Sequence, residues 1–261
     1  MRIYSLFILI FFVGTLWAQE YDAYEKKVFI EGTDTLQYRI LYPEKMKEGK
    51  KYPLILFLHG AGERGDDNQK QLTHGGKLFL DKKIRKKYPA IVVFPQCPDG
   101  VMWTNRQKHQ NEDGEWIFEF PVDNKAPWPT LLVDQLVDEI AQRKQIDKKR
   151  MYIMGISMGG IGTLEFLHRF ENKYAAVTVI CGGHNPELSK SYQDKPIWFF
   201  HGGKDNVVPM HYSKDVFDKI QGYNSKTKYT LYPEANHNSW DAALAEPKLL
   251  HWLFSKKLNQ K

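Results

Sequence analysis

Cysteine is scarce in this chain of 261 residues, which contains only Cys97 and Cys181. Two cysteines cannot build the disulfide framework of a small secreted scaffold. Each follows an apolar run that is typical of a strand, and we expect two buried thiols, although export would also permit a bridge between them. The sequence also lacks a C-x-x-C pair and two histidines four residues apart, so it indicates no metal site.

Long hydrophobic runs are equally scarce, and the one that exists is short. Residues 6–13 are apolar without interruption, after the basic Arg2 and before the small residues Gly14 and Ala18. A membrane-spanning helix needs ~20 apolar residues, whereas this layout is typical of a secretory signal peptide. We therefore predict a signal peptide over residues 1–18 and a secreted or periplasmic protein, with an uncleaved membrane anchor as the alternative.

An excess of charge of one sign is also missing. The chain has 37 basic and 31 acidic residues, a formal net charge of +6, and loss of Arg2 with the signal peptide lowers this to +5. The basic residues are scattered and form no aromatic–basic array of the kind that binds nucleic acid, so a solvated surface is the simplest interpretation. We expect no nucleic-acid partner and no stable membrane insertion after signal removal.

No linker, repeat or low-complexity stretch divides the remainder, so we predict a single domain over residues 19–261. Continuous apolar runs, typical of buried parallel strands, alternate with runs of apolar residues at helical spacing. This alternation predicts an α/β fold with a mostly parallel central sheet and helices on both faces. After a strand pair at 27–30 and 36–41, the strand-like runs are 53–58, 90–94, 150–154, 175–180, 196–200 and 228–232, and the helical runs are 129–140, 161–170, 210–220 and 247–258.

Residues 101–127 interrupt this alternation with a polar, irregular stretch that includes Trp103 and Trp116. A loop of this length in a compact domain is usually functional or mobile. It leaves the carboxyl end of the strand predicted at 90–94, the edge where ligands bind in open α/β sheets. We interpret it as a loop insertion that caps the site or forms a substrate wall, with an ordinary surface insertion as the alternative.

A G-x-S-x-G motif stands at residues 155–159, with Ser157 at its centre. A strand-like run precedes it and a helix-like run follows it, which is the context of a nucleophile elbow. The two flanking glycines permit a tight turn without a side-chain clash. The pattern therefore predicts that Ser157 is a catalytic nucleophile, although a glycine-rich loop before a packed helix would give the same five letters.

A serine hydroxyl is a weak nucleophile at neutral pH and needs a base, which in turn needs an orienting acid. On this type of fold the chain order is serine, acid, histidine. His237 follows the last strand-like run, in a loop at the expected carboxyl edge, and is the predicted base. Asp205 follows the preceding strand-like run and is the predicted acid. Their alternative roles are a surface histidine and a helix-capping aspartate.

Two backbone amides are expected to form an oxyanion hole beside the serine. One should belong to Met158, the residue after the nucleophile, and the other to Ala61, which follows the turn at His59 and Gly60. We expect a structural role for His59. Glu63 and Arg64 either line the pocket or pair with each other to hold this loop, and we favour the pair.

Taken together, these motifs resemble the α/β-hydrolase superfamily over nearly the whole mature chain. The order of the His59–Gly60 loop, the elbow, the segment 201–205 and His237 carries this resemblance. More narrowly, the chain resembles secreted feruloyl and acetyl-xylan esterases, polyhydroxybutyrate-depolymerase-like esterases and predicted peptidases of the prolyl-oligopeptidase type. The residues behind this are 59–65, the segment 95–98 with Trp103, and His237 with Trp240.

The resemblance implies a serine carboxylesterase that works through an acyl-serine intermediate, without a metal or organic cofactor. Neither a propeller domain nor a carbohydrate-binding module is found in the sequence. We expect a small-molecule or oligosaccharide ester as substrate, including acyl groups on plant polysaccharide, with Trp103 and Trp240 as aromatic pocket walls. A serine peptidase for short peptides and a catalytically inactive binding protein on the same fold are the alternatives.

Overall fold

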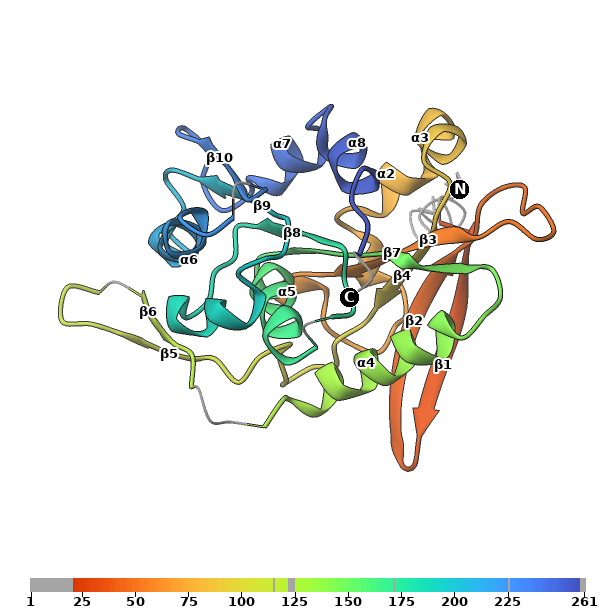
Figure 1. The fold of residues 1–261 in the computed structure, drawn as a ribbon. Helices are drawn as coiled ribbons and strands as arrows, with labels where there is room; N and C mark the ends of the chain where they lie inside the picture. The colour runs from red at the N-terminus through yellow and green to blue at the C-terminus, as the bar shows by residue number, and fades with distance from the viewer. Residues whose placement is uncertain (1–20, 115, 122–124, 171, 225, 259–261) are drawn as a thin grey trace, which may run out of the picture.

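A central sheet of eight strands organises the protein in a computed structural model that describes residues 21–114, 116–121, 125–170, 172–224 and 226–258 (Figure 1). The predicted signal peptide lies outside the described residues. The strand order is β1-β2-β4-β3-β7-β8-β9-β10. The bounds of these strands are β1 (Tyr24–Glu31), β2 (Asp34–Leu41), β3 (Tyr52–Leu58), β4 (Ile91–Pro95), β7 (Ile146–Ile156), β8 (Ala176–Ile180), β9 (Ile197–Gly202) and β10 (Lys228–Tyr232).

Within the eight-stranded sheet, only the pairs that involve β2 are antiparallel, with β1 on one side and β4 on the other. The other pairs in this sheet are parallel. Strands β3, β4, β8 and β9 are buried at every position. Their unbroken apolar sequences therefore reflect coverage of the sheet on both faces. The predicted fold class, a mostly parallel sheet in an α/β-hydrolase fold, is confirmed.

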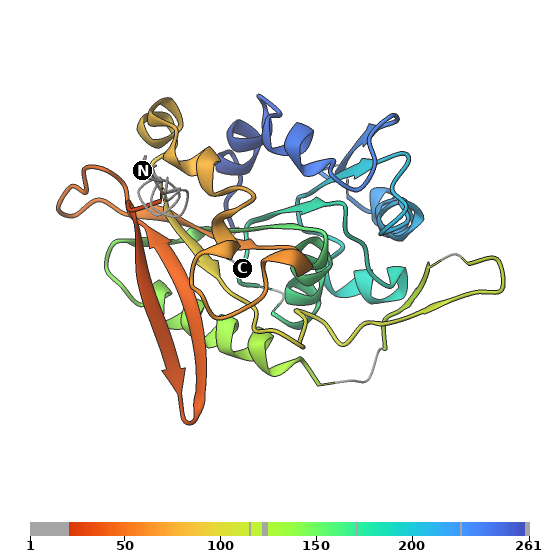
Figure 2. The same ribbon diagram turned by 180° about the vertical axis from the view of Figure 1, so that it is seen from behind.

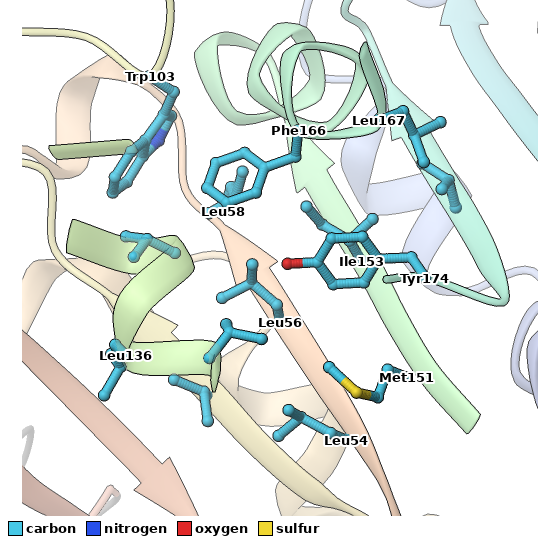
Figure 3. Close-up of a cluster of buried hydrophobic side chains, with 14 of the residues drawn as sticks. Leu54, Leu56, Leu58, Trp103, Leu136, Met151, Ile153, Phe166, Leu167 and Tyr174 are labelled. Atoms are coloured by element: carbon cyan, nitrogen blue, oxygen red, sulfur yellow. The ribbon is translucent and has the colours of Figure 1, made fainter. Parts of the chain in front are cut away.

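Helices cover the two faces and create two separate hydrophobic clusters (Figures 1 and 2). One cluster receives side chains from α4, α5 and α6, and Figure 3 shows part of it. The other receives side chains from α2, α7 and α8. The helices and 3-10 turns are η1 (Ala61–Glu63), η2 (Lys70–Leu72), α2 (Gly76–Leu80), α3 (Lys82–Lys87), α4 (Trp128–Ala141), α5 (Met158–Arg169), η3 (Pro186–Tyr192), α6 (His211–Gln221), α7 (Trp240–Leu244) and α8 (Leu249–Phe254).

The carboxyl ends of the parallel strands meet at one edge of the sheet. In the strand register, Leu58 pairs with Gly155, and Ile156 pairs with Ile180, which pairs with Phe200. The loops after β3, β7, β9 and β10 therefore leave the sheet side by side. These are the four loops in which the sequence places its candidate triad and oxyanion-hole residues.

The stretch at 101–127 is more regular than the sequence suggests. Its middle part forms an antiparallel pair, β5 (Gln107–Gln110) and β6 (Trp116–Glu119), which extends from the body of the protein (Figure 1). The backbone amide of Phe118 donates to the Tyr212 hydroxyl at 2.7 Å, and the two rings stack with centroids 5.1 Å apart. The hairpin is thus attached to the start of α6, at the carboxyl edge of the sheet.

Candidate active site

Ser157 occupies a sharp turn between β7 and α5, with φ 51° and ψ −118°. Residues with a side chain rarely adopt a positive φ, and they keep it only where the surroundings impose it. The Ser157 amide donates to the Ile180 carbonyl at 2.9 Å, and the Ser157 carbonyl accepts from the Ile161 amide at 2.9 Å. The predicted strand–turn–helix context of the motif is confirmed.

Both glycines of the motif are required by close backbone contacts. A Cβ atom at Gly155 would lie 2.2 Å from the Gly159 carbonyl oxygen, and one at Gly159 would lie 2.0 Å from the Leu58 carbonyl oxygen. These distances are far inside van der Waals contact. The glycines therefore allow α5 to start directly against the end of β3, which brings Ser157 next to the loop that carries Gly60.

A chain of hydrogen bonds joins the three residues that the sequence singles out. Ser157 Oγ lies 2.8 Å from His237 Nε2, and His237 Nδ1 lies 2.8 Å from Asp205 Oδ2. With the proton on Nδ1, the ring donates to the carboxylate and its Nε2 accepts from the serine hydroxyl. Ser157 and His237 are partly exposed, whereas the Asp205 side chain is fully buried.

Four donors surround the Asp205 carboxylate. Oδ1 accepts from the amides of Val207 and Val208, each at 2.9 Å, while Oδ2 lies 2.8 Å from His237 and 3.3 Å from Nε2 of the buried His201. Burial alone would raise the pKa of this carboxyl, but the hydrogen bonds from His201 and His237 hold its pKa well below the usual range. Asp205 is therefore an anion under all ordinary conditions.

His201 also surrounds the Asp205 carboxylate, and the sequence did not predict this role. Its Nε2 lies 2.9 Å from the Val208 carbonyl oxygen, and its Nδ1 lies 2.7 Å from the Ser213 hydroxyl on α6. It thus connects β9 to the loop that carries Asp205. The only sequence signal was the position of a histidine at the end of a buried strand, four residues before the acid.

The loop after β3 is held by His59, which is fully buried. Its Nδ1 lies 2.6 Å from the Gly60 carbonyl oxygen, and its Nε2 accepts from the Cys97 amide at 2.9 Å. Burial lowers the pKa of His59 to about 4, so the ring is neutral and acts as one donor and one acceptor. Because the peptide unit is planar, fixing the Gly60 carbonyl also fixes the direction of the Ala61 amide in the same unit.

The predicted partnership between Glu63 and Arg64 is wrong. Arg64 donates to the backbone carbonyls of Ala61 at 3.0 Å and Val101 at 3.2 Å. Glu63 instead faces His74, with Oε1 3.7 Å from His74 Nε2. Both residues still hold the loop, but through Val101, His74 and the backbone of Ala61 rather than through each other.

Trp103 does not line a pocket, so the prediction that it forms a pocket wall is wrong. Its side chain is fully buried in the hydrophobic cluster that also contains Leu58 and Phe166 (Figure 3). The indole Nε1 donates to the His59 carbonyl at 3.2 Å, and a Cβ atom at Gly162 would lie 2.7 Å from Trp103 Cβ. Trp103 is therefore a packing residue that fixes α5 against the end of β3.

Trp103→Ala should consequently cost stability rather than selectivity. Removing a buried aromatic side chain typically destabilises a protein by about 3–5 kcal/mol. We expect urea unfolding to show a loss of this size, and kcat/KM to fall by the same factor for a feruloyl and an acetyl ester. Trp128→Ala is the matched control, because Trp128 is 39% exposed and should cost less than ~1 kcal/mol. A selective loss with the feruloyl ester would restore the pocket-wall role.

Trp240, the second predicted wall, does lie beside the site. It is partly exposed, and its ring meets the His237 ring edge-on with centroids 5.4 Å apart. On its other side it contacts His74, at 4.9 Å between centroids. The placement is compatible with a wall next to the candidate base, and its contact with a substrate stays a prediction.

Both cysteines are free and buried. Cys97 belongs to the cluster under α4 and α5, and Cys181 to the cluster on the opposite face of the sheet. The expectation of two buried thiols is confirmed. Burial raises the pKa of the Cys97 thiol to about 12, so this thiol is unreactive at neutral pH. Within the described part of the chain, no helix is long and apolar enough to cross a membrane.

Comparison with known proteins assigns this chain to a family. Residues 45–248 match the model of the Phospholipase/Carboxylesterase family, and the chain belongs to that family. It is 28% identical over 185 residues to the bifunctional acetylxylan esterase/xylanase XynS20E of Neocallimastix patriciarum, covering 69% of this chain but only 24% of that protein. It is 26% identical over 221 residues to lysophospholipase-like protein 1 of Mus musculus, covering 80% of this chain and 88% of that one.

A solved structure described as that of a thermostable esterase is similar at a TM-score of 0.81 and 30% identity. The match covers 92% of this chain and 64% of that chain. The chain thus spans about a quarter of the acetylxylan esterase/xylanase and less than two thirds of the thermostable esterase. Membership of the esterase and hydrolase family of α/β hydrolases is established, and the resemblance inferred from the motifs is confirmed.

Proposed function

We propose that the protein is a serine carboxylesterase in which Ser157, His237 and Asp205 form the catalytic triad. The observation that carries this proposal is the continuous chain of hydrogen bonds, 2.8 Å from Ser157 to His237 and 2.8 Å from His237 to Asp205. Ser157 stands at a sharp elbow that exposes its hydroxyl, and the adjacent histidine can take up the hydroxyl proton and so activate the oxygen to attack a carbonyl.

In the proposed reaction, Ser157 Oγ attacks the ester carbonyl while His237 Nε2 takes up the hydroxyl proton. The tetrahedral intermediate collapses when the bond to the alcohol breaks and His237 returns the proton to the departing oxygen. This leaves an acyl group on Ser157. Water, activated by the same histidine, then releases the carboxylic acid and restores the serine. Asp205 stays ionised and stabilises the imidazolium throughout.

The amides of Met158 and Ala61 are the proposed oxyanion hole. Met158 is the first residue of α5 and Ala61 the first of η1, so neither N–H has an acceptor within its own helical turn. Gly60, which precedes Ala61, is so close that a Cβ atom there would lie 3.6 Å from Ser157 Cβ. The amino end of α5 adds a partial positive charge where the oxyanion forms.

We further propose that the protein is exported after removal of residues 1–18 and acts on acylated plant carbohydrate. The basic start and short apolar stretch of the sequence support export. The similarity to an acetylxylan esterase/xylanase supports the substrate class. Mass spectrometry of exported protein that still carries residues 1–18 would contradict the signal-peptide assignment.

A substrate panel tests the proposed reaction. We expect acetyl and feruloyl esters to be cleaved with a much higher kcat/KM than aminoacyl amides, because resonance stabilises the carbonyl of an ester less than that of an amide, so that the serine attacks it more readily. Esters with longer acyl chains complete the panel, and their kcat/KM values show which chain length the site accepts. Efficient amide cleavage without preference for esters would assign a peptidase instead, and no turnover of any substrate would assign a binding protein.

A further inference from the structure

Three residues from separate parts of the chain form a cluster next to the candidate base, which we call the Glu63 cluster: Glu63, His74 and Trp240. Glu63 Oε1 lies 3.7 Å from His74 Nε2. The His74 ring lies 4.9 Å from the Trp240 ring, which in turn lies 5.4 Å from the His237 ring. All three side chains are partly exposed, so a bound molecule can reach them.

The carboxylate of Glu63 is close to the nucleophile. A Cβ atom at Gly60 would lie 3.0 Å from Glu63 Oε2 and 3.6 Å from Ser157 Cβ. The Glu63 oxygen and Ser157 Cβ are therefore at most 6.6 Å apart, the sum of 3.0 and 3.6 Å. Glu63 thus lies within the reach of a substrate that is bound to Ser157.

The direction of proton transfer indicates which part of the substrate lies next to the Glu63 cluster. His237 must return its proton to the leaving alcohol, so the alcohol lies beside His237 Nε2. Trp240 flanks His237, and the Glu63–His74 pair lies beyond Trp240. An alcohol group beside His237 Nε2 would therefore also be near this cluster.

A carboxylate in this place does not help the chemical step. A negative charge beside the oxyanion hole opposes the charge that forms on the carbonyl oxygen. Burial of the side chain, which is 12% exposed, raises the pKa of Glu63, while the adjacent His74 lowers it. Arg64, its neighbour in sequence, points to backbone carbonyls instead. The backbone amides of Gly60 and Glu63 also favour the ionised form of this carboxyl. Because a carboxylate has about four acceptor sites, Glu63 can also accept a hydrogen bond from a substrate group.

We propose that Glu63, held by His74, accepts a hydrogen bond from a hydroxyl group of the leaving alcohol, and that the ring of this alcohol packs on Trp240. An aromatic face next to a carboxylate acceptor suits a polyhydroxylated ring. The cluster would therefore select O-acylated sugars over esters of simple alcohols. This inference rests on the proposed esterase function.

Two acetyl esters that differ only in the leaving group provide the test: methyl O-acetyl-xyloside and 4-nitrophenyl acetate. Both form the same acetyl-serine, so any difference in kcat/KM arises from acylation. For Glu63→Ala we expect kcat/KM to fall by about 10- to 100-fold with the sugar ester, the usual range for loss of a hydrogen bond to a charged group. With 4-nitrophenyl acetate, whose leaving group has no hydroxyl, we expect less than a threefold change.

Glu63→Gln keeps the shape and one acceptor, and should fall between the wild type and Glu63→Ala with the sugar ester. Glu25→Gln is the matched control, because Glu25 is an exposed carboxylate on the far edge strand β1, and both substrates should be unaffected. An equal fall with both esters would make Glu63 a structural residue and overturn the proposal. An unchanged kcat/KM with the sugar ester would overturn it as well. If hydrolysis persists in Ser157→Ala, the esterase assignment itself fails, which is a separate outcome.

Discussion

Ser157→Ala should lower kcat for 4-nitrophenyl acetate by ~10³-fold or more, because only the oxyanion hole and substrate binding would remain. The hydroxyl that lies 2.8 Å from His237 Nε2 is the proposed attacking group. Steady-state hydrolysis measures this loss. Labelling of the wild type with a fluorophosphonate, followed by mass spectrometry of the modified peptide, tests whether Ser157 is the reactive serine. Near wild-type turnover in the purified variant would exclude Ser157 as the nucleophile.

The fold should survive this substitution. The Ser157 side chain makes no capping hydrogen bond to α5, and alanine meets the same backbone restriction at φ 51° as serine does. Circular dichroism and the thermal unfolding midpoint of Ser157→Ala should therefore resemble those of the wild type. A loss of activity that is accompanied by unfolding would leave the nucleophile assignment without support.

Ser191→Ala is the matched control for the loss of a serine–histidine contact. Ser191 Oγ lies 3.1 Å from His168 Nδ1 and donates to the Leu188 carbonyl, within η3. This pair lacks the strained elbow, and we expect Ser191→Ala to retain its activity. The comparison separates the effect of the elbow and its oxyanion amides from the mere presence of a hydrogen-bonded serine and histidine.

The elbow could be predicted from sequence because its determinants are local. Five consecutive residues encode the turn, and the adjacent apolar runs encode β7 and α5. His237 and Asp205 could be predicted because chain order and strand ends restrict the choice. Parallel strands bring their carboxyl ends together, so residues at those ends become neighbours regardless of the 80 positions between Ser157 and His237.

The surroundings of the site could not be predicted in the same way. Trp103 stands in a polar stretch, and its complete burial depends on the gap between Gly162 and the end of β3. Glu63 contacts His74, which precedes the short helix α2 that the apolar periodicity did not indicate. These contacts are set by the packing of distant segments, and no regular spacing records them.

The same limit applies to His201. Its distance from Asp205 depends on how the chain turns after β9, with Val208 and Ser213 as further partners. Sequence identifies the acid, but the structure shows why it remains ionised.

Asp205→Asn should reduce kcat by about 10³–10⁴-fold while the fold persists. An asparagine amide can donate to His237 Nδ1, which would move the ring proton to Nε2 and prevent that nitrogen from accepting the Ser157 proton. His237→Ala should have a similarly large effect. Asp218→Asn is the matched control, since Asp218 is an exposed residue on α6 whose carboxylate binds Lys214, and its activity should be unchanged.

Combining Asp205→Asn or His237→Ala with Ser157→Ala should add little to the loss caused by Ser157→Ala alone. Groups that act as a unit in one step are strongly non-additive, because removing one member already disables the others. Single-turnover rates of the single and double variants measure this. Losses that multiply across the three sites would mean that the residues act independently, which contradicts a triad.

The pH dependence of stability gives an independent check on Asp205. Its pKa in the folded protein lies well below the value of ~3.9 expected in an unfolded chain. The unfolded state therefore takes up the proton first as the solution becomes acidic, so this carboxylate stabilises the fold above pH ~4 and loses that contribution as the pH falls through the folded-state pKa. Asp205→Asn removes the titrating group. Between pH 6 and pH 3, the free energy of unfolding should consequently decline less steeply in Asp205→Asn than in the wild type. Parallel declines would show that, in solution, the hydrogen bonds from His201 and His237 do not stabilise this carboxylate as they do in the structure.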